Sequence, residues 1–117
     1  MGQLSTHVLD TMHGDPAKGM DIRLFRIEKG GANQLAKVTT NEDGRTEGPL
    51  LEGDALIAGI YEIRFYVGNY YQDMGVELPQ PNFLGEVSIR FGIANPEEDF
   101  HVPFLVSPWS YSTYRGS

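Results

Sequence analysis

The chain contains no cysteine, and lysine occurs only three times in its 117 residues. The lack of thiols excludes disulfides, cysteine nucleophiles, zinc–thiolate sites and iron–sulfur clusters. The formal net charge is −7, whereas a protein that binds the phosphate backbone of a nucleic acid presents a basic face. We therefore expect no nucleic-acid partner.

Long hydrophobic runs are also missing. No segment reaches the ~20 consecutive apolar residues that a membrane-spanning helix needs. The first six residues, Met1 to Thr6, have neither the basic start nor the apolar stretch of a signal peptide. These features predict a cytoplasmic protein with no membrane partner.

The length predicts one domain that covers residues 1–117. A chain of this size buries roughly two-thirds of the surface that its unfolded form exposes, which supports a core without disulfides. The acidic residues are scattered over the chain instead of forming one tail, and this distribution is typical of a well-dispersed globular protein.

Alternating apolar and polar residues predict half-buried β-strands. The clearest pattern is Val87, Ile89, Phe91 and Ile93, with polar residues or glycine between them. The expected strands cover residues 4–10, 20–28, 34–40, 45–51, 60–67, 83–93, 100–106 and 110–117. About eight short strands without a long helical pattern predict an all-β fold, a β-sandwich.

Turn-forming and capping residues predict the connections. The segments 30–33 and 41–44 are typical of links between neighbouring antiparallel strands. One short helix is expected from Asn69 to Met74, with Asn69 as its N-cap and Gly75 as its terminator.

Two histidines carry the main chemical signal. By alternation, His7 lies opposite the apolar face of its strand, and His101 lies opposite Phe100 and Val102. Each can line a groove or a subunit interface, where a near-neutral pKa suits proton transfer. The alternative is a pair of surface histidines without a chemical task. A metal site would need a third ligand, and no carboxylate has a recognisable ligand spacing. His13 is expected to be solvent-exposed in a loop.

Arg45 and the end of the sequence supply further candidates. Arg45 follows the turn at 41–44, so its guanidinium is held at a defined place and could clamp a carbonyl or carboxylate, although an ordinary surface arginine is the alternative. The last residues keep Tyr114 and Arg115 in a strand-like, hydroxyl-rich segment, which indicates docking against a partner surface. Neither a serine-hydrolase elbow nor a phosphate-binding loop is found.

Three sequence blocks together resemble one known family, over nearly the whole chain. The blocks are Leu4-Ser5-Thr6-His7-Val8-Leu9-Asp10, Thr40-Asn41 with Asp43-Gly44-Arg45, and His101-Val102-Pro103 with Ser107-Pro108 and Tyr114-Arg115-Gly116-Ser117. They are similar to the transthyretin-like hydrolases that open the ring of 5-hydroxyisourate in urate degradation. The last block is the most specific, because it separates these hydrolases from transthyretin itself.

This resemblance implies a transthyretin-like sandwich of eight strands and one short helix, assembled as a homotetramer (a dimer of dimers) without a cofactor or a bound metal. The implied catalytic residues are His7, Arg45 and His101, and the implied substrate-binding residues are Tyr114, Arg115, Gly116 and Ser117. The departures from the family pattern are mild. Among them is Asp99, close enough to His101 in sequence to alter its electrostatics.

The reaction implied is hydrolysis of 5-hydroxyisourate to 2-oxo-4-hydroxy-4-carboxy-5-ureidoimidazoline. Two other classes of function are considered. A carrier of an apolar aromatic ligand could use the same sandwich, but two histidines and an arginine make a polar pocket that such a carrier would not need. A structural β-sandwich module gives no reason for a docked polar chain end.

Overall fold

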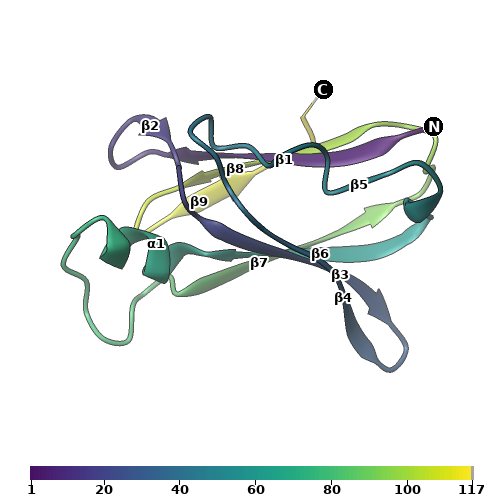
Figure 1. The fold of residues 1–117 in the computed structure, drawn as a ribbon. Coiled ribbons are helices and arrows are strands. Elements are labelled where there is room, and N and C mark those ends of the chain that lie inside the picture. Colours follow the sequence, from purple (N-terminus) through teal and green to yellow (C-terminus); the bar gives the residue numbers. More distant parts are fainter. Residues whose placement is uncertain (117) are drawn as a thin grey trace.

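A computed structural model describes residues 1–116 as two packed β-sheets (Figure 1). Within these residues the sheets contain nine strands: β1 (Gln3–Asp10), β2 (Asp15–Pro16), β3 (Asp21–Glu28), β4 (Gly31–Thr39), β5 (Leu51–Glu52), β6 (Gly59–Tyr66), β7 (Glu86–Ile93), β8 (Phe100–Val106) and β9 (Tyr111–Thr113). One sheet, the β1 sheet, has the order β2-β1-β8-β9, with β5 also on β1; the other, the β3 sheet, has the order β4-β3-β6-β7. The expected all-β sandwich is confirmed.

Alternating side chains from both sheets form the core. Along β1, Leu4, Thr6 and Val8 are buried, whereas the residues between them are only half-buried. At the centre, the rings of Phe65 from β6 and Phe104 from β8 stack with their centroids 3.9 Å apart. The inner face of each sheet therefore supplies the hydrophobic contacts, and the outer face of the β1 sheet carries the half-buried Ser5, His7 and His101.

The parallel pairing of β1 and β8 joins the two ends of the chain. All the other strand pairs among residues 1–116 are antiparallel. In the parallel register Ser5 lies beside His101, and His7 lies beside Pro103. This pairing places the two histidines on one surface, because both belong to the half-buried positions of their strands.

Residues 45–51 do not form the continuous strand that the sequence predicted. Arg45 makes an isolated bridge with His7, and regular pairing resumes only in β5. The turn at 41–44 is present, with the Gly44 amide donating to the Asn41 carbonyl over 3.0 Å. The turn leads from β4 in one sheet to a bridge with β1 in the other. The prediction that it links neighbouring antiparallel strands is therefore wrong. Gly44 is required there, since a Cβ would lie 2.4 Å from the Val8 carbonyl oxygen.

The short helix α1 (Val67–Asp73) begins two residues before the expected start. Tyr66 occupies the N-cap position, and no side chain caps the helix, so the predicted capping role of Asn69 is wrong. Burial of Val67, Tyr70 and Tyr71 on one helical face explains the earlier start, because packing outweighs a local cap. Gly75, with a φ of 84°, follows the helix end as expected.

Other boundaries also shift. The hairpin between β3 and β4 turns at Lys29 and Gly30, because Glu28 already pairs with Gly31. The strand expected from residue 83 begins at Glu86. The final strand β9 is shorter than the predicted 110–117, although Gly116 bridges to His101. Ser117 lies outside the described residues. No described helix is long and apolar enough to cross a membrane.

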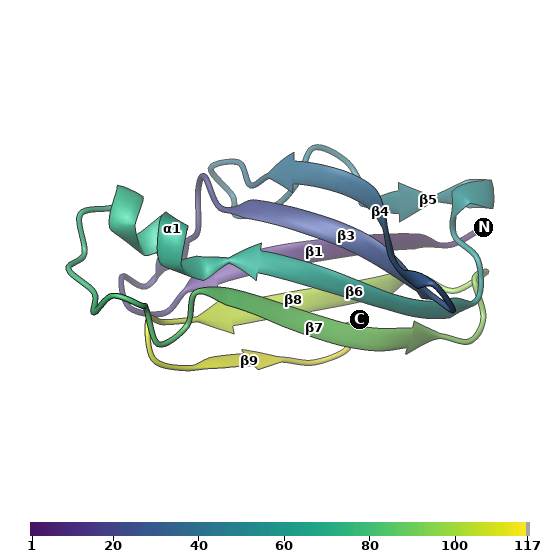
Figure 2. The same ribbon diagram turned by 90° about the horizontal axis from the view of Figure 1, so that it is seen from below.

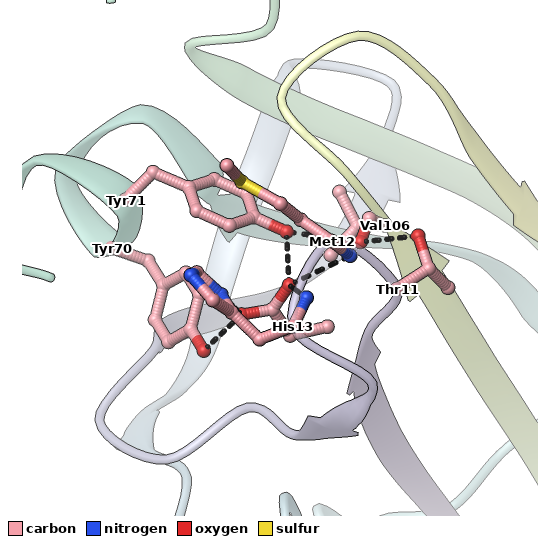
Figure 3. Close-up of polar contacts among 7 residues, drawn as sticks. Thr11, Met12, His13, Tyr70, Tyr71 and Val106 are labelled. Atoms are coloured by element: carbon pink, nitrogen blue, oxygen red, sulfur yellow. Dashed lines mark hydrogen bonds and ion pairs between the residues drawn. The ribbon is translucent and has the colours of Figure 1, made fainter. Parts of the chain in front are cut away.

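A buried carboxylate fastens α1 to the end of β1 (Figure 3). Asp10 is fully buried, and its Oδ1 and Oδ2 accept hydrogen bonds of 2.7 and 2.8 Å from the hydroxyls of Tyr71 and Tyr70. The backbone amides of Met12 and His13 also donate to Oδ1. Nδ1 of His13 lies 2.6 Å from Oδ2. His13 is therefore in an exposed loop, as expected, but its ring is tied to a buried acid.

Candidate active site

Four segments bring the three predicted catalytic residues and the predicted substrate-binding residue Gly116 together on the outer face of the β1 sheet. His7 lies on β1 and His101 on β8, and each is half-buried. Arg45 pairs with His7 through an isolated antiparallel bridge, and Gly116 pairs with His101 in the same way. Residues from both ends and the middle of the chain thus share one surface.

The two histidine rings are close but not in contact. Their centroids are 6.5 Å apart and their planes are inclined by 31°. Nδ1 of His101 lies 2.8 Å from the Ser5 hydroxyl oxygen, within hydrogen-bond distance. The ring of His101 is therefore held by Ser5.

The environment keeps both histidines neutral more readily than in water. Burial lowers the pKa of His7, and the positive charge of Arg45 lowers it further, whereas the contacts with Asp43 act in the opposite direction. Burial also lowers the pKa of His101, followed by the charges of Arg45 and of His7. A neutral imidazole can accept a proton, so both rings are suited to general-base chemistry near neutral pH.

A groove of about 300 Å³ opens on this face. It is lined by Gln3, Ser5, Arg45, Asp99, Phe100 and His101. The backbone N–H of Gln3 donates a hydrogen bond of 3.2 Å to a carboxylate oxygen of Asp99, the residue expected from the sequence to influence His101. The charges that lower the pKa of His101 come from Arg45 and His7.

The chain end approaches His101 through its backbone. The Gly116 amide donates to the His101 carbonyl oxygen over 2.8 Å. A Cβ at Gly116 would lie 2.8 Å from Cδ2 of the His101 ring and 3.2 Å from Cγ of Pro103. Only glycine fits at this distance without displacing its neighbours.

Tyr114 and Arg115 line a different hollow. This cleft of about 400 Å³ lies between β7 and β8, and His101 contributes to it as well. The Arg115 guanidinium lies 4.3 Å from the centre of the Phe100 ring and donates to the Asp99 carbonyl over 3.2 Å. Within one chain, these two side chains therefore do not share the groove with Arg45. The predicted site residue Ser117 lies outside the described residues.

Sequence reasoning did not assign a role to Ser5, which contacts His101. The sequence did contain a signal for this residue, because strand alternation places Ser5 on the same face as His7. Its contact with His101 depends on the parallel register of β1 and β8 and could not be read from the sequence alone. No group of three or more potential metal-ligating side chains is found among residues 1–116.

The β-sandwich fold identifies the structural class to which this protein belongs. The structure is similar to sea bream transthyretin solved with thyroxine, with a TM-score of 0.86 and 24% identity over 97% of this chain and 94% of that one. This match establishes a transthyretin-like fold.

Closer relatives specify the family. The Klebsiella pneumoniae 5-hydroxyisourate hydrolase structure matches with a TM-score of 0.83 and 36% identity, and each chain is covered completely. A Ralstonia nicotianae protein named 5-hydroxyisourate hydrolase is 58% identical over the full length of both chains. The HIUase/Transthyretin family profile matches residues 4–116, and the chain belongs to this family.

Proposed function

We propose that this protein is a hydrolase that converts 5-hydroxyisourate to 2-oxo-4-hydroxy-4-carboxy-5-ureidoimidazoline in urate degradation. The observation that carries the proposal is the pair His7 and His101, both with a lowered pKa and with ring centroids 6.5 Å apart, beside the groove that Arg45 and His101 line. The names of the close relatives support the same substrate. Hydrolysis needs one group that takes a proton and one that gives a proton, and two histidines can meet both needs.

The reaction breaks a cyclic amide bond. A water molecule adds its oxygen to the ring carbonyl carbon while one histidine removes a proton from it. The carbon–nitrogen bond then breaks, and the other histidine protonates the leaving nitrogen. Arg45 holds the carbonyl oxygen and stabilises the negative charge that develops on it, which is the type of electrostatic stabilisation that usually contributes most. We assign the two roles to the histidines jointly, because burial and Arg45 lower the pKa of both rings.

The chain end completes the proposed site. Gly116 lets the backbone lie against His101. In this proposal Tyr114, Arg115 and Ser117 shape the pocket and orient the substrate. Because Tyr114 and Arg115 line the cleft beside β7 within one chain, they are proposed to meet substrate in a site formed between subunits.

We further propose a homotetramer, a dimer of dimers, formed by a single domain over residues 1–117 in the cytoplasm. Both sheets end on the same side of the sandwich, with β7 and β9 as their edge strands (Figure 2). Beside this edge the aromatic side chains of Phe83, Trp109 and Tyr111 are exposed. Unpaired strand edges and exposed aromatic groups support association between copies. Cell fractionation would test the compartment.

The direct test generates the substrate in place. Urate oxidase converts urate to 5-hydroxyisourate, whose ultraviolet absorbance decays spontaneously. Adding this protein should accelerate the decay, and adding the His101→Asn variant at the same concentration should not. A decay unchanged by the wild-type protein would contradict the hydrolase proposal and favour the carrier function.

A further inference from the structure

We infer that Ser5 is a positioning residue for His101: its hydroxyl accepts a hydrogen bond from Nδ1–H and leaves Nε2 as the atom that exchanges protons. The role of Nε2 in proton exchange rests on the proposed function, because it requires that His101 takes part in the hydrolysis. The orientation of the ring follows from geometry alone. The family resemblance implies roles for His7, Arg45, His101 and the chain end, but none for Ser5.

The contact is built into the sheet. Ser5 lies directly beside His101 in the parallel register of β1 and β8, and its hydroxyl oxygen is 2.8 Å from Nδ1. Both residues are half-buried, which limits competition from water. A short side chain on a central strand has little freedom to leave this position.

The ring is held on both sides. Nδ1 and Cδ2 are the two ring atoms bonded to Cγ; Ser5 contacts Nδ1, and the Gly116 backbone approaches the Cδ2 side. The remaining edge of the ring, formed by Cε1 and Nε2, points away from the backbone of His101. Two neighbours therefore fix the direction in which Nε2 faces.

A hydroxyl suits this task in either catalytic role. If His101 acts as a base, Nε2 gains a proton; if it acts as an acid, Nε2 loses one. Nδ1 keeps its hydrogen in both cases, so the bond to the Ser5 oxygen persists through the whole cycle. The ring can change its charge without losing its orientation.

Because the partner of Nδ1 is the neutral hydroxyl of Ser5, the His101 ring can still gain and lose a proton. A carboxylate partner at Nδ1 would favour the charged imidazolium, whereas a hydroxyl orients the ring without adding charge. Ser5 thus supplies orientation while Arg45 and burial favour the neutral form of His101.

The activity test compares Ser5→Ala with Ser5→Thr. Loss of one neutral hydrogen bond should lower kcat by about tenfold and change KM by less than about threefold, because the alanine variant keeps the groove but releases the ring. Threonine retains the hydroxyl and should restore kcat to within about threefold of wild type. Ser88→Ala, on the exposed face of β7 in the other sheet, is the matched control. If the wild type is active and the Ser5→Ala variant has the same kcat, the inference is overturned.

A second readout does not depend on turnover. The chain has three histidines, so their ring nitrogens can be assigned by nitrogen-15 NMR with single His→Asn variants. We expect His101 to carry its neutral-state hydrogen on Nδ1 in the wild type and to shift towards the Nε2–H tautomer in Ser5→Ala. A tautomer that does not change would overturn the inference. An inactive wild type with the expected tautomer change would instead refute the proposed function and leave the positioning role of Ser5 supported.

Discussion

The ring centroids of His7 and His101 lie 6.5 Å apart, although the two residues come from opposite ends of the chain. At this distance the charge of His7 contributes, after burial and Arg45, to the lowered pKa of His101. The protonation of His101 therefore depends on the charge of His7. The positive charge of Arg45 lowers the pKa of both rings.

Replacing either histidine should remove activity without unfolding the protein. His101→Asn and His7→Asn should each lower kcat by about 10²–10⁴-fold, the usual contribution of a positioned proton-transfer group. Both side chains face away from the core, so thermal unfolding should change little. Steady-state kinetics and thermal melts check both parts. A variant that kept more than about a tenth of wild-type kcat would show that its histidine is a bystander.

The pH profile should respond to the charge at position 45. Because burial and Arg45 lower both histidine pKa values, the acid limb of kcat/KM should lie below 6.5, the ordinary histidine value. Arg45→Gln removes the charge, so the acid limb of its residual activity should move to higher pH, whereas Arg45→Lys should keep it near the wild-type position. Profiles from pH 5 to 8 for the three proteins provide the measurement. An acid limb that stays in place in Arg45→Gln would exclude this electrostatic role.

Adding one methyl group at Gly116 should disturb His101. The new Cβ would meet Cδ2 of the ring at 2.8 Å, so the ring or the chain end must shift. We expect Gly116→Ala to lower kcat by about tenfold or more, because a displacement near 1 Å is costly for catalysis. The control is Gly30→Ala, where a Cβ meets nothing within 4 Å. Wild-type kcat in Gly116→Ala would show that the close approach has no catalytic importance.

Asp10 should be a major source of stability. Asp10→Asn places an amide N–H₂ against donor groups of Tyr70, Tyr71 and His13, and we expect a loss of about 2–4 kcal/mol in the free energy of unfolding. Burial alone raises the Asp10 pKa, but the hydrogen bonds outweigh it and hold the pKa below its usual range. The contribution is therefore present above the unfolded-state pKa and is lost as pH falls through the folded-state pKa.

Urea denaturation at neutral and acidic pH tests this stability prediction. The exposed Asp73→Asn, on the same helix that Asp10 anchors, serves as the control and should change the free energy of unfolding by less than about 0.5 kcal/mol. An equal and small effect of the two substitutions would show that the buried carboxylate is not the anchor of α1.

The proposed assembly predicts a mass near four times the 13.0 kDa of one chain in light scattering. Replacing the exposed Trp109 by Glu should weaken the assembly, because the charge would have to be buried at an interface. Turnover should fall in proportion to the tetramer that is lost. A fully active monomer would contradict a site shared between subunits.

Local patterns in the sequence determined the fold class, most strand positions and the outward direction of both histidines. Alternation sufficed because an apolar side chain on a two-sided sheet must face the core, and this requirement is local. Gly75 likewise marked the helix end through its own backbone preference. The family resemblance, carried by blocks around His7, Arg45 and His101, indicated which outward-facing residues belong together.

Tertiary structure alone decided how these residues meet. The parallel pairing of β1 with β8 brings Ser5 to His101, and nothing in either strand specifies that register by itself. The path from β4 across to β1 places Arg45 beside His7 and replaces the expected strand at 45–51 by a single bridge. The earlier start of α1 follows from burying Tyr70 and Tyr71 over Asp10. In each case the deciding contact joins residues far apart in the chain, so its energy is absent from any local pattern.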